Sequence, residues 1–110
     1  MVNKIEIMIP NYSAIINEGN CFINDHEINV NKSDIDEIIR IIRDWKQEYK
    51  ALFAEEIYTI RVITDKDNVV YKFYNAFPKD FYLLSDYLGD LYDKEKNSGN
   101  MLSPERFAGR

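Results

Sequence analysis

Apolar residues in this chain are spaced in two different ways, and the spacing switches repeatedly along the sequence. In the segments 4–9, 58–63 and 69–74 the residues alternate between two faces, as they do in a strand with one buried side. In the segments 35–52 and 81–92 apolar residues recur every three or four positions, which is the period of an amphipathic helix. The chain is therefore predicted to combine strands and helices.

The first 30 residues are typical of strands joined by short turns. The three isoleucines of segment 4–9 share one face, which predicts a half-buried strand. Two further short strands are expected on either side of residues 18–20, where a glycine can adopt a positive φ. A tight turn is predicted at Asn24–Asp25, after which Ile28 and Val30 continue the alternation.

The first helix is predicted to begin at Ser33. Asp36 follows three residues later and completes an acidic variant of the capping box. Asp36 and Arg40 have the spacing of a favourable ion pair along a helix. The helix is expected to continue to residue 52, because its apolar stripe consists of Ile35, Ile38, Ile42, Trp45, Tyr49 and Leu52.

The segments 58–63 and 69–74 are predicted to form a β-hairpin with residues 65–68 as a four-residue loop. The face expected in the core consists of Ile60, Val62, Tyr71 and Phe73. The opposite face is mixed in character and consists of Arg61, Ile63, Val70, Lys72 and Tyr74. Exposed apolar groups on a sheet indicate either a partner or a covering segment. The N-terminal strand, or the tail residues Met101, Leu102 and Phe107, could supply such cover.

The second helix is predicted to contain Pro78 in its first turn, with Asp80 near its positive end. Its buried stripe is expected to consist of Phe81, Leu84, Leu88 and Leu91, with Tyr92 alongside. Residues 97–110 lack periodicity and are expected to form a flexible C-terminal tail, which leaves residues 1–96 as a single domain.

These elements predict an α+β fold with the order β-β-β-α-β-β-α. Short connections between consecutive strands imply antiparallel pairing. Two amphipathic helices can then cover one face of an antiparallel sheet of about four to six strands, which gives a two-layer domain.

The formal net charge of −5 at pH 7 disfavours nucleic acid and anionic membranes as partners, since both require a basic surface. No segment has the apolar length of a membrane helix or of a signal peptide. With one cysteine, the chain cannot form an internal disulfide, so a cytoplasmic location is expected. The richness in Ile, Asn, Lys and Tyr is typical of an AT-rich bacterium or its phage.

Residues suited to catalysis or to metal binding are few. Cys21 and His26 are the only thiol and imidazole, and a turn between them could bring them together as a nucleophile and its base. A buried thiol beside a polar turn residue is the simpler interpretation. The segment 65–68 resembles a calcium loop slightly but lacks the required glycine and distal glutamate. We therefore expect no metal, no cofactor and no catalytic residue.

A cluster of acidic and aromatic residues on the second helix is the main candidate for a binding surface. Helical spacing places these residues on the side away from the core: Tyr82, Leu83, Asp86, Asp90 and Asp93. Aspartates four residues apart repel one another, and aspartate is a mediocre helix former. Such local penalties can mark a functional surface, although a solvated acidic face is the simpler interpretation.

The sequence thus favours a small non-enzymatic module, similar in size and charge to an inhibitor or immunity protein, that occludes a protein partner with a basic surface. In that mechanism the acidic helix side meets the partner and the outer hairpin face adds apolar area. One alternative is a homodimer or larger homo-oligomer that pairs through its sheet face. Another is a small enzyme or ligand-binding domain that uses Cys21 and His26.

Overall fold

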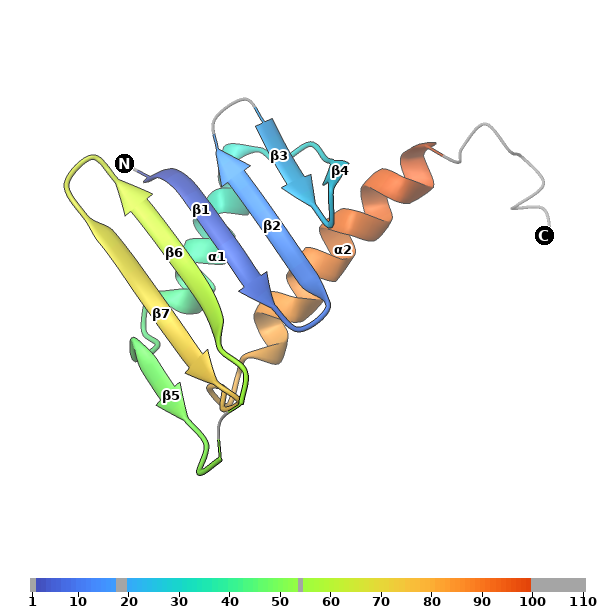
Figure 1. Cartoon of the computed structure of the whole chain (residues 1–110). Helices are drawn as coiled ribbons and strands as arrows, with labels where there is room; N and C mark the ends of the chain where they lie inside the picture. The colour runs from blue at the N-terminus through green and yellow to red at the C-terminus, as the bar shows by residue number, and fades with distance from the viewer. Residues whose placement is uncertain (1, 18–19, 54, 100–110) are drawn as a thin grey trace.

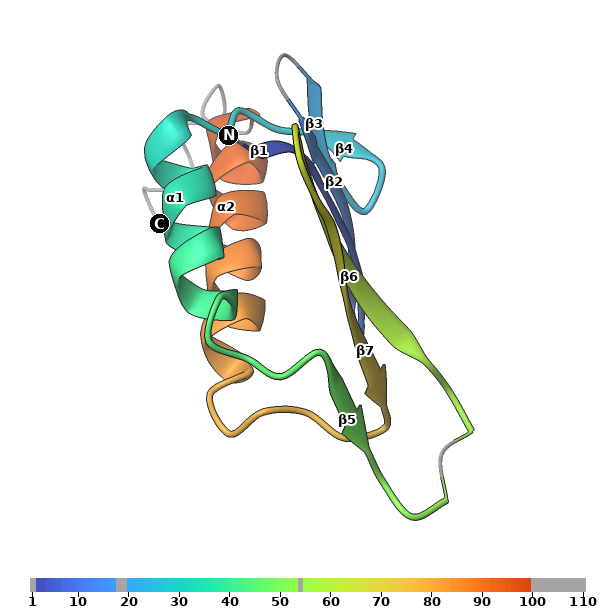
Figure 2. The same ribbon diagram turned by 90° about the vertical axis from the view of Figure 1, so that its left-hand side faces the viewer.

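A computed structural model describes residues 2–17, 20–53 and 55–99, with the backbone alone for 95–99 (Figure 1). Nine elements follow one another in the order β1 (Val2–Ile9), β2 (Tyr12–Asn17), β3 (Asn20–Ile23), β4 (His26–Glu27), α1 (Lys32–Ile42), β5 (Glu48–Lys50), β6 (Tyr58–Thr64), β7 (Asn68–Tyr74) and α2 (Tyr82–Gly99). Both helices lie on the same face of the sheet (Figure 2). The predicted two-layer α+β fold is confirmed.

Within the described residues the sheet has seven strands in the order β4-β3-β2-β1-β6-β7-β5, which is more than expected. All neighbouring strands are antiparallel except β5, which runs parallel to β7. The additional strands, β4 and β5, contain only two and three residues, too few to show an alternating pattern. Ile28 and Val30 therefore lie beyond the end of β4, not in a strand.

Asparagine and aspartate in left-handed conformations form the turns that connect the first strands. Asn24 and Asp25 have φ values of 50° and 68°, which are typical of the predicted tight hairpin turn. The Asn24 side chain also accepts a 2.8 Å hydrogen bond from the Ser13 amide and donates one of 3.1 Å to the Asn11 carbonyl. The turn after β3 is thereby joined to the turn after β1.

The start of α1 differs from the prediction by two residues. Asn31, not Ser33, is the N-cap, and its side chain accepts a hydrogen bond from the Asp34 amide. Asp34 completes the capping box by accepting from the Asn31 amide at 3.1 Å. Asparagine caps helices as well as serine does, so the sequence did not discriminate between the two positions. Arg40 pairs with Glu37, whereas the prediction paired it with Asp36.

The predicted extension of α1 to Leu52 is wrong. The helix ends at Ile42, and residues 48–50 form the edge strand β5 instead. Trp45 remains buried, but its indole donates a 2.9 Å hydrogen bond to Asp80, just before α2. Leu52 lies past β5 and is 88% exposed. Residues 48–50 pair with β7, and the Trp45 indole bonds to Asp80. These tertiary contacts outweigh the helical spacing of the apolar residues in this segment.

The core lies between the sheet and the two helices. The predicted buried face of the β6–β7 hairpin is confirmed, since none of its residues is more than 8% exposed: Ile60, Val62, Tyr71 and Phe73. The loop of this hairpin contains residues 65–67, because Asn68 already belongs to β7. The isoleucines of β1 are also buried, with Ile5 fully so.

The helix α2 presents its predicted apolar stripe to the sheet. Leu84 and Leu88 are fully buried, while Phe81 and Tyr92 are partly buried against the core. Pro78 lies in a turn before the helix, where its carbonyl accepts from the Phe81 amide, and not in the first helical turn. The helix continues to Gly99, so its last three residues fall in the segment predicted as a tail; residues 100–110 lie outside the described part.

Gly89 allows Tyr12 of β2 to lie close against α2. A Cβ atom at position 89 would be 2.7 Å from the Tyr12 hydroxyl oxygen. We expect Gly89→Ala to destabilise the wild-type chain by about 1 kcal/mol through this clash. In a Tyr12→Phe background the same change should stabilise it by about 1 kcal/mol, because alanine is the better helix former. Urea unfolding of the four proteins measures this coupling, and an equal effect in both backgrounds would contradict it.

Candidate functional site

The exposed side of α2 carries the residues predicted to bind a partner, and we call it the acidic helix face: Tyr82, Leu83, Asp86, Asp90 and Asp93. Tyr82 is 60% exposed and Leu83 is 37% exposed, although both have large apolar surfaces. All three aspartates are exposed. Among the interactions of residues 2–17, 20–53 and 55–94, none pairs these carboxylates with a cation or a hydrogen-bond donor.

A tyrosine–aspartate hydrogen bond links α2 to α1 along one border of the acidic helix face. The Tyr87 hydroxyl donates to the Asp34 carboxylate at 2.6 Å. Burial, this hydrogen bond and the charges of Asp34 and Glu37 raise the pKa of Tyr87 to about 12. Tyr87 thus remains neutral at physiological pH and fixes the position of α2 relative to α1.

Asp34 extends the acidic surface from α2 onto α1, since its carboxylate accepts the hydrogen bond from Tyr87, and the charge of Glu37 on the same helix also raises the pKa of Tyr87. The pattern within α2 alone did not reveal this extension, because Tyr87 and Asp34 are 53 residues apart in the chain. The Glu37 carboxylate is in turn paired with Arg40, and its pKa is lowered by the hydrogen bonds from that guanidinium.

The second predicted surface is the face of the sheet that the helices leave open, and we call it the outer sheet face. The strand registers place all its predicted residues on that side: Arg61, Ile63, Val70, Lys72 and Tyr74. Lys50 of β5 lies over the Tyr74 ring at 5.2 Å. β1 cannot cover this face because it is the central strand of the sheet, and the tail lies outside the described residues.

The most exposed apolar residues of the outer sheet face come from strands β1 to β3, and the prediction did not include them. Met8 is 55% exposed, Ile15 is 43% exposed and Phe22 is 36% exposed. Their signal was present in the sequence, since the position of Met8 opposite the buried isoleucines of β1 places it on the outer side. Without the strand order, however, nothing indicated that they adjoin the hairpin.

The acidic helix face and the outer sheet face lie on opposite sides of the molecule. Figure 2 shows both helices on one side of the sheet and the other side open. A single flat partner therefore cannot contact both surfaces, and the expected mechanism in which the hairpin adds apolar area to the acidic interface stays a prediction that requires a partner reaching both sides of the molecule. The two surfaces are separate candidate interfaces.

The structure does not bring Cys21 and His26 together as a nucleophile and its base. The Cys21 thiol is buried and donates to the Asn17 carbonyl at 3.3 Å. Burial raises its pKa, which favours the less nucleophilic neutral thiol. In the strand register His26 lies opposite Ile23, and its ring packs edge-on against Tyr92 with 5.4 Å between centroids.

The described part of the chain has neither the ligand cluster of a metal site nor a helix suited to span a membrane. Within it, no three His, Cys, Asp or Glu side chains are grouped so that they could hold a metal ion. In the hairpin loop Asp65 instead accepts a 2.9 Å hydrogen bond from Asn3. Neither described helix has the length and apolar character needed to cross a membrane.

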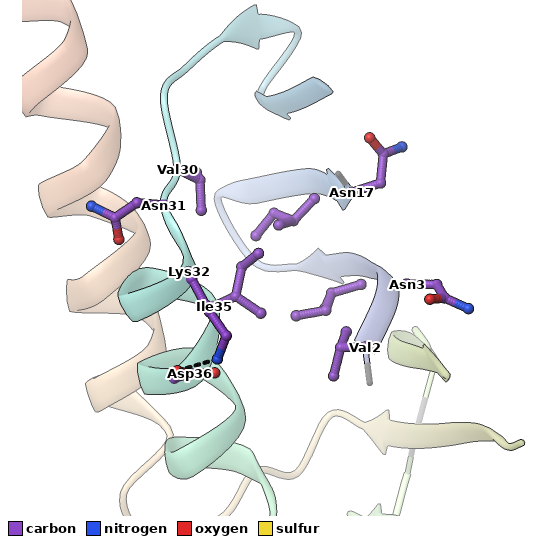
Figure 3. A pocket seen from close by; sticks show the side chains of 10 residues that line it. Val2, Asn3, Asn17, Val30, Asn31, Lys32, Ile35 and Asp36 are labelled. Atoms are coloured by element: carbon purple, nitrogen blue, oxygen red, sulfur yellow. Dashed lines mark hydrogen bonds and ion pairs between the residues drawn. The ribbon is translucent and has the colours of Figure 1, made fainter. Parts of the chain in front are cut away.

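A pocket of about 500 Å³ lies where the start of β1 and the end of β2 meet the start of α1 (Figure 3). Val2, Val30 and Ile35 point into it, whereas the amides of Asn3 and Asn31 point away. Its polar residues already have partners: Asn31 caps α1, Asn3 binds Asp65 and Lys32 pairs with Asp36 at 3.2 Å. The pocket therefore offers apolar walls but few free polar groups to orient a ligand.

Comparison with known proteins found no matching family model, no matching curated protein and no matching solved structure.

Proposed function

We propose that the protein is a small non-enzymatic binding module that occupies a basic surface of a protein partner through the acidic helix face. The observation that carries this proposal is the exposure of Tyr82 and Leu83 beside three aspartates without described ion-pair partners. The solvent-facing side of a helix is usually stabilised by lysine and glutamate residues whose charges balance one another. Here the aspartates repel one another, and a basic partner would relieve that repulsion.

The two kinds of residue in this face have different roles in the proposed interface. Aspartates on the rim accelerate association by attracting a basic surface over long distances. Tyr82 and Leu83 supply apolar area that loses water when the partner docks, and tyrosine is enriched among residues that dominate binding energy. Because the face is the convex side of a helix, it would act by covering the partner's surface, in the manner of an inhibitor or immunity protein.

Reversing the central charges of the acidic helix face is expected to weaken partner binding at least about tenfold, since close charge pairs contribute more than 1 kcal/mol. The variant is Asp86→Lys with Asp90→Lys. Its matched control is Asp44→Lys with Asp67→Lys, two exposed aspartates away from the face. Each Asp→Lys change adds two charges, so both double variants have a net charge of −1 instead of −5.

The partner for this measurement is the protein retained by the immobilised wild-type chain from its host, identified by mass spectrometry and then purified. Calorimetric titration gives its dissociation constant for the wild type and for both double variants. Equal weakening by the two variants would mean that net charge alone matters, and would contradict the assignment of the acidic helix face. Circular dichroism confirms that each variant is folded.

A further inference from the structure

No other described segment covers the outer sheet face (Figure 2). Its apolar residues are neighbours across the strands, since the register aligns Phe22 with Ile15 and Ile15 with Glu6 of β1. On the other side of β1 the same row continues to Arg61 and Val70. The full row therefore begins with Glu27 of β4, which the register aligns with Phe22, continues with an apolar pair and a charged pair, and ends with an apolar residue.

The charges of this face are nearly balanced, although the whole chain is strongly acidic. Among the described strand residues, four cations share the face with three anions: Lys4, Lys50, Arg61 and Lys72 with Glu6, Glu27 and Glu48. Glu6 lies 3.1 Å from Lys4 and 3.8 Å from Arg61. Two copies of a chain with a net charge of −5 repel one another least when these faces meet.

The distribution of charge across the face is also self-complementary. β1 is the central strand, with three strands on each side of it. The half made by β2 to β4 has Glu27 as its charged residue, whereas the half made by β5 to β7 has an excess of cations. A two-fold axis along β1 lays each half of one copy over the opposite half of the other, so that the half with Glu27 meets the half with the excess of cations.

The area of the face matches the size of a stable interface. With strands about 4.8 Å apart and a rise of about 3.4 Å per residue, the residues of the seven strands together cover roughly 600 Å² per copy. A symmetric pair would then bury about 1,200 Å², at the lower end of the range for specific protein interfaces.

We propose that two copies of this chain form a symmetric dimer through their outer sheet faces, with the two-fold axis along β1. Phe22 of one copy then lies over the β7 strand of the other, near Val70, and Met8 lies close to the axis. The acidic helix faces remain free on the two outer sides of the dimer. This proposal goes beyond the proposed function and does not depend on it, because it concerns the opposite side of the molecule.

Sedimentation equilibrium over the micromolar to millimolar range tests this proposal, with the full-length wild-type chain expected at the mass of two chains. Ile15→Glu with Phe22→Glu should reduce the measured mass to that of one chain, because it places charges in a dry apolar contact. The matched control is Tyr82→Glu with Leu83→Glu, which also places two glutamates on exposed apolar positions, since Leu83 is 37% exposed and Phe22 is 36% exposed. The control should retain the mass of two chains.

The orientation of the two copies is tested by reversing charges. Glu27→Lys should weaken the dimer several-fold, because it places a cation against the half with the excess of cations, and adding Lys72→Glu should restore part of the loss by removing a cation from that half. Weakening without restoration would overturn the axis along β1. Circular dichroism of each variant establishes that a lower mass does not reflect unfolding.

A measurement on the wild-type chain covers the case in which the double variant fails to fold. The methyl resonance of Met8, labelled with carbon-13, should shift on dilution, since Met8 is 55% exposed in the single chain and covered in the pair. A wild type with the mass of one chain at every concentration would overturn the proposal. So would a change of mass with dilution during which the Met8 resonance stays fixed.

Discussion

Replacing Phe73 by alanine is expected to lower the free energy of unfolding by about 4 kcal/mol, the cost of emptying a large buried aromatic site. Phe73 is fully buried in β7, at the centre of an aromatic cluster. Four rings surround it with centroid distances of 5.5 to 6.1 Å: Trp45, Tyr49, Phe77 and Phe81. These rings come from β5, from the segment before it and from the segment before α2, so the cavity would loosen several parts of the fold together.

Urea unfolding followed by the fluorescence of the single tryptophan measures this change, because Trp45 contacts Phe73 directly. The aromatic control is Tyr82→Ala, whose ring is 60% exposed and should cost less than about 0.5 kcal/mol. A loss below about 1 kcal/mol for Phe73→Ala would show that the cluster does not stabilise the fold as its burial indicates.

Trp45→Ala and Leu52→Ala are expected to have very different effects, although both residues belong to the same apolar stripe in the sequence. Removal of Trp45 should cost about 3–5 kcal/mol, since its side chain is 7% exposed and its indole donates to Asp80. Removal of Leu52 should change stability by less than about 0.5 kcal/mol, because its side chain is 88% exposed.

Circular dichroism during urea unfolding compares the two variants, as the first one lacks the fluorescent residue. A helix that continued from Ile42 to Leu52 would bury both side chains, and both variants would then lose similar stability. Asp80→Asn is expected to lower the free energy of unfolding less than Trp45→Ala does, because the amide oxygen can still accept the indole hydrogen bond.

The parts of the fold that could be predicted are those in which one face is buried over a long segment. Alternation assigned Ile5 of β1 and Phe73 of β7 to the core, and helical spacing did the same for Leu84 and Leu88 of α2. In each case the burial of one face requires a fixed period, so the pattern and the structure agree. The two shortest strands lacked enough residues to show any period.

The errors arose where tertiary contacts decided between locally similar alternatives. Asn31 and Ser33 are both good helix caps, and the capping box with Asp34 selects the first. The helical stripe beyond Ile42 is real in the sequence, but Trp45 binds Asp80 and residues 48–50 pair with β7. These contacts join segments that are distant in the chain, so no local pattern contains them.

The candidate surfaces were also predictable where a single segment displays them, and not where several segments meet. Helical spacing alone placed Tyr82, Leu83 and the three aspartates on one side of α2, and their exposure in the structure agrees with that placement. The contact of Tyr87 with Asp34 on α1 depends on helix packing and was not visible beforehand. The strand order places Met8, Ile15 and Phe22 on the same sheet face as the outer residues of the hairpin.

By itself the sequence determined which side of each long strand and helix is buried, because the hydrophobic effect acts on periodic faces that a single segment displays. Only the tertiary structure decided where α1 ends, that β1 occupies the centre of the sheet, and that the acidic helix face and the outer sheet face point in opposite directions. These features depend on which segments meet in space. Each is set by contacts between residues far apart in the chain.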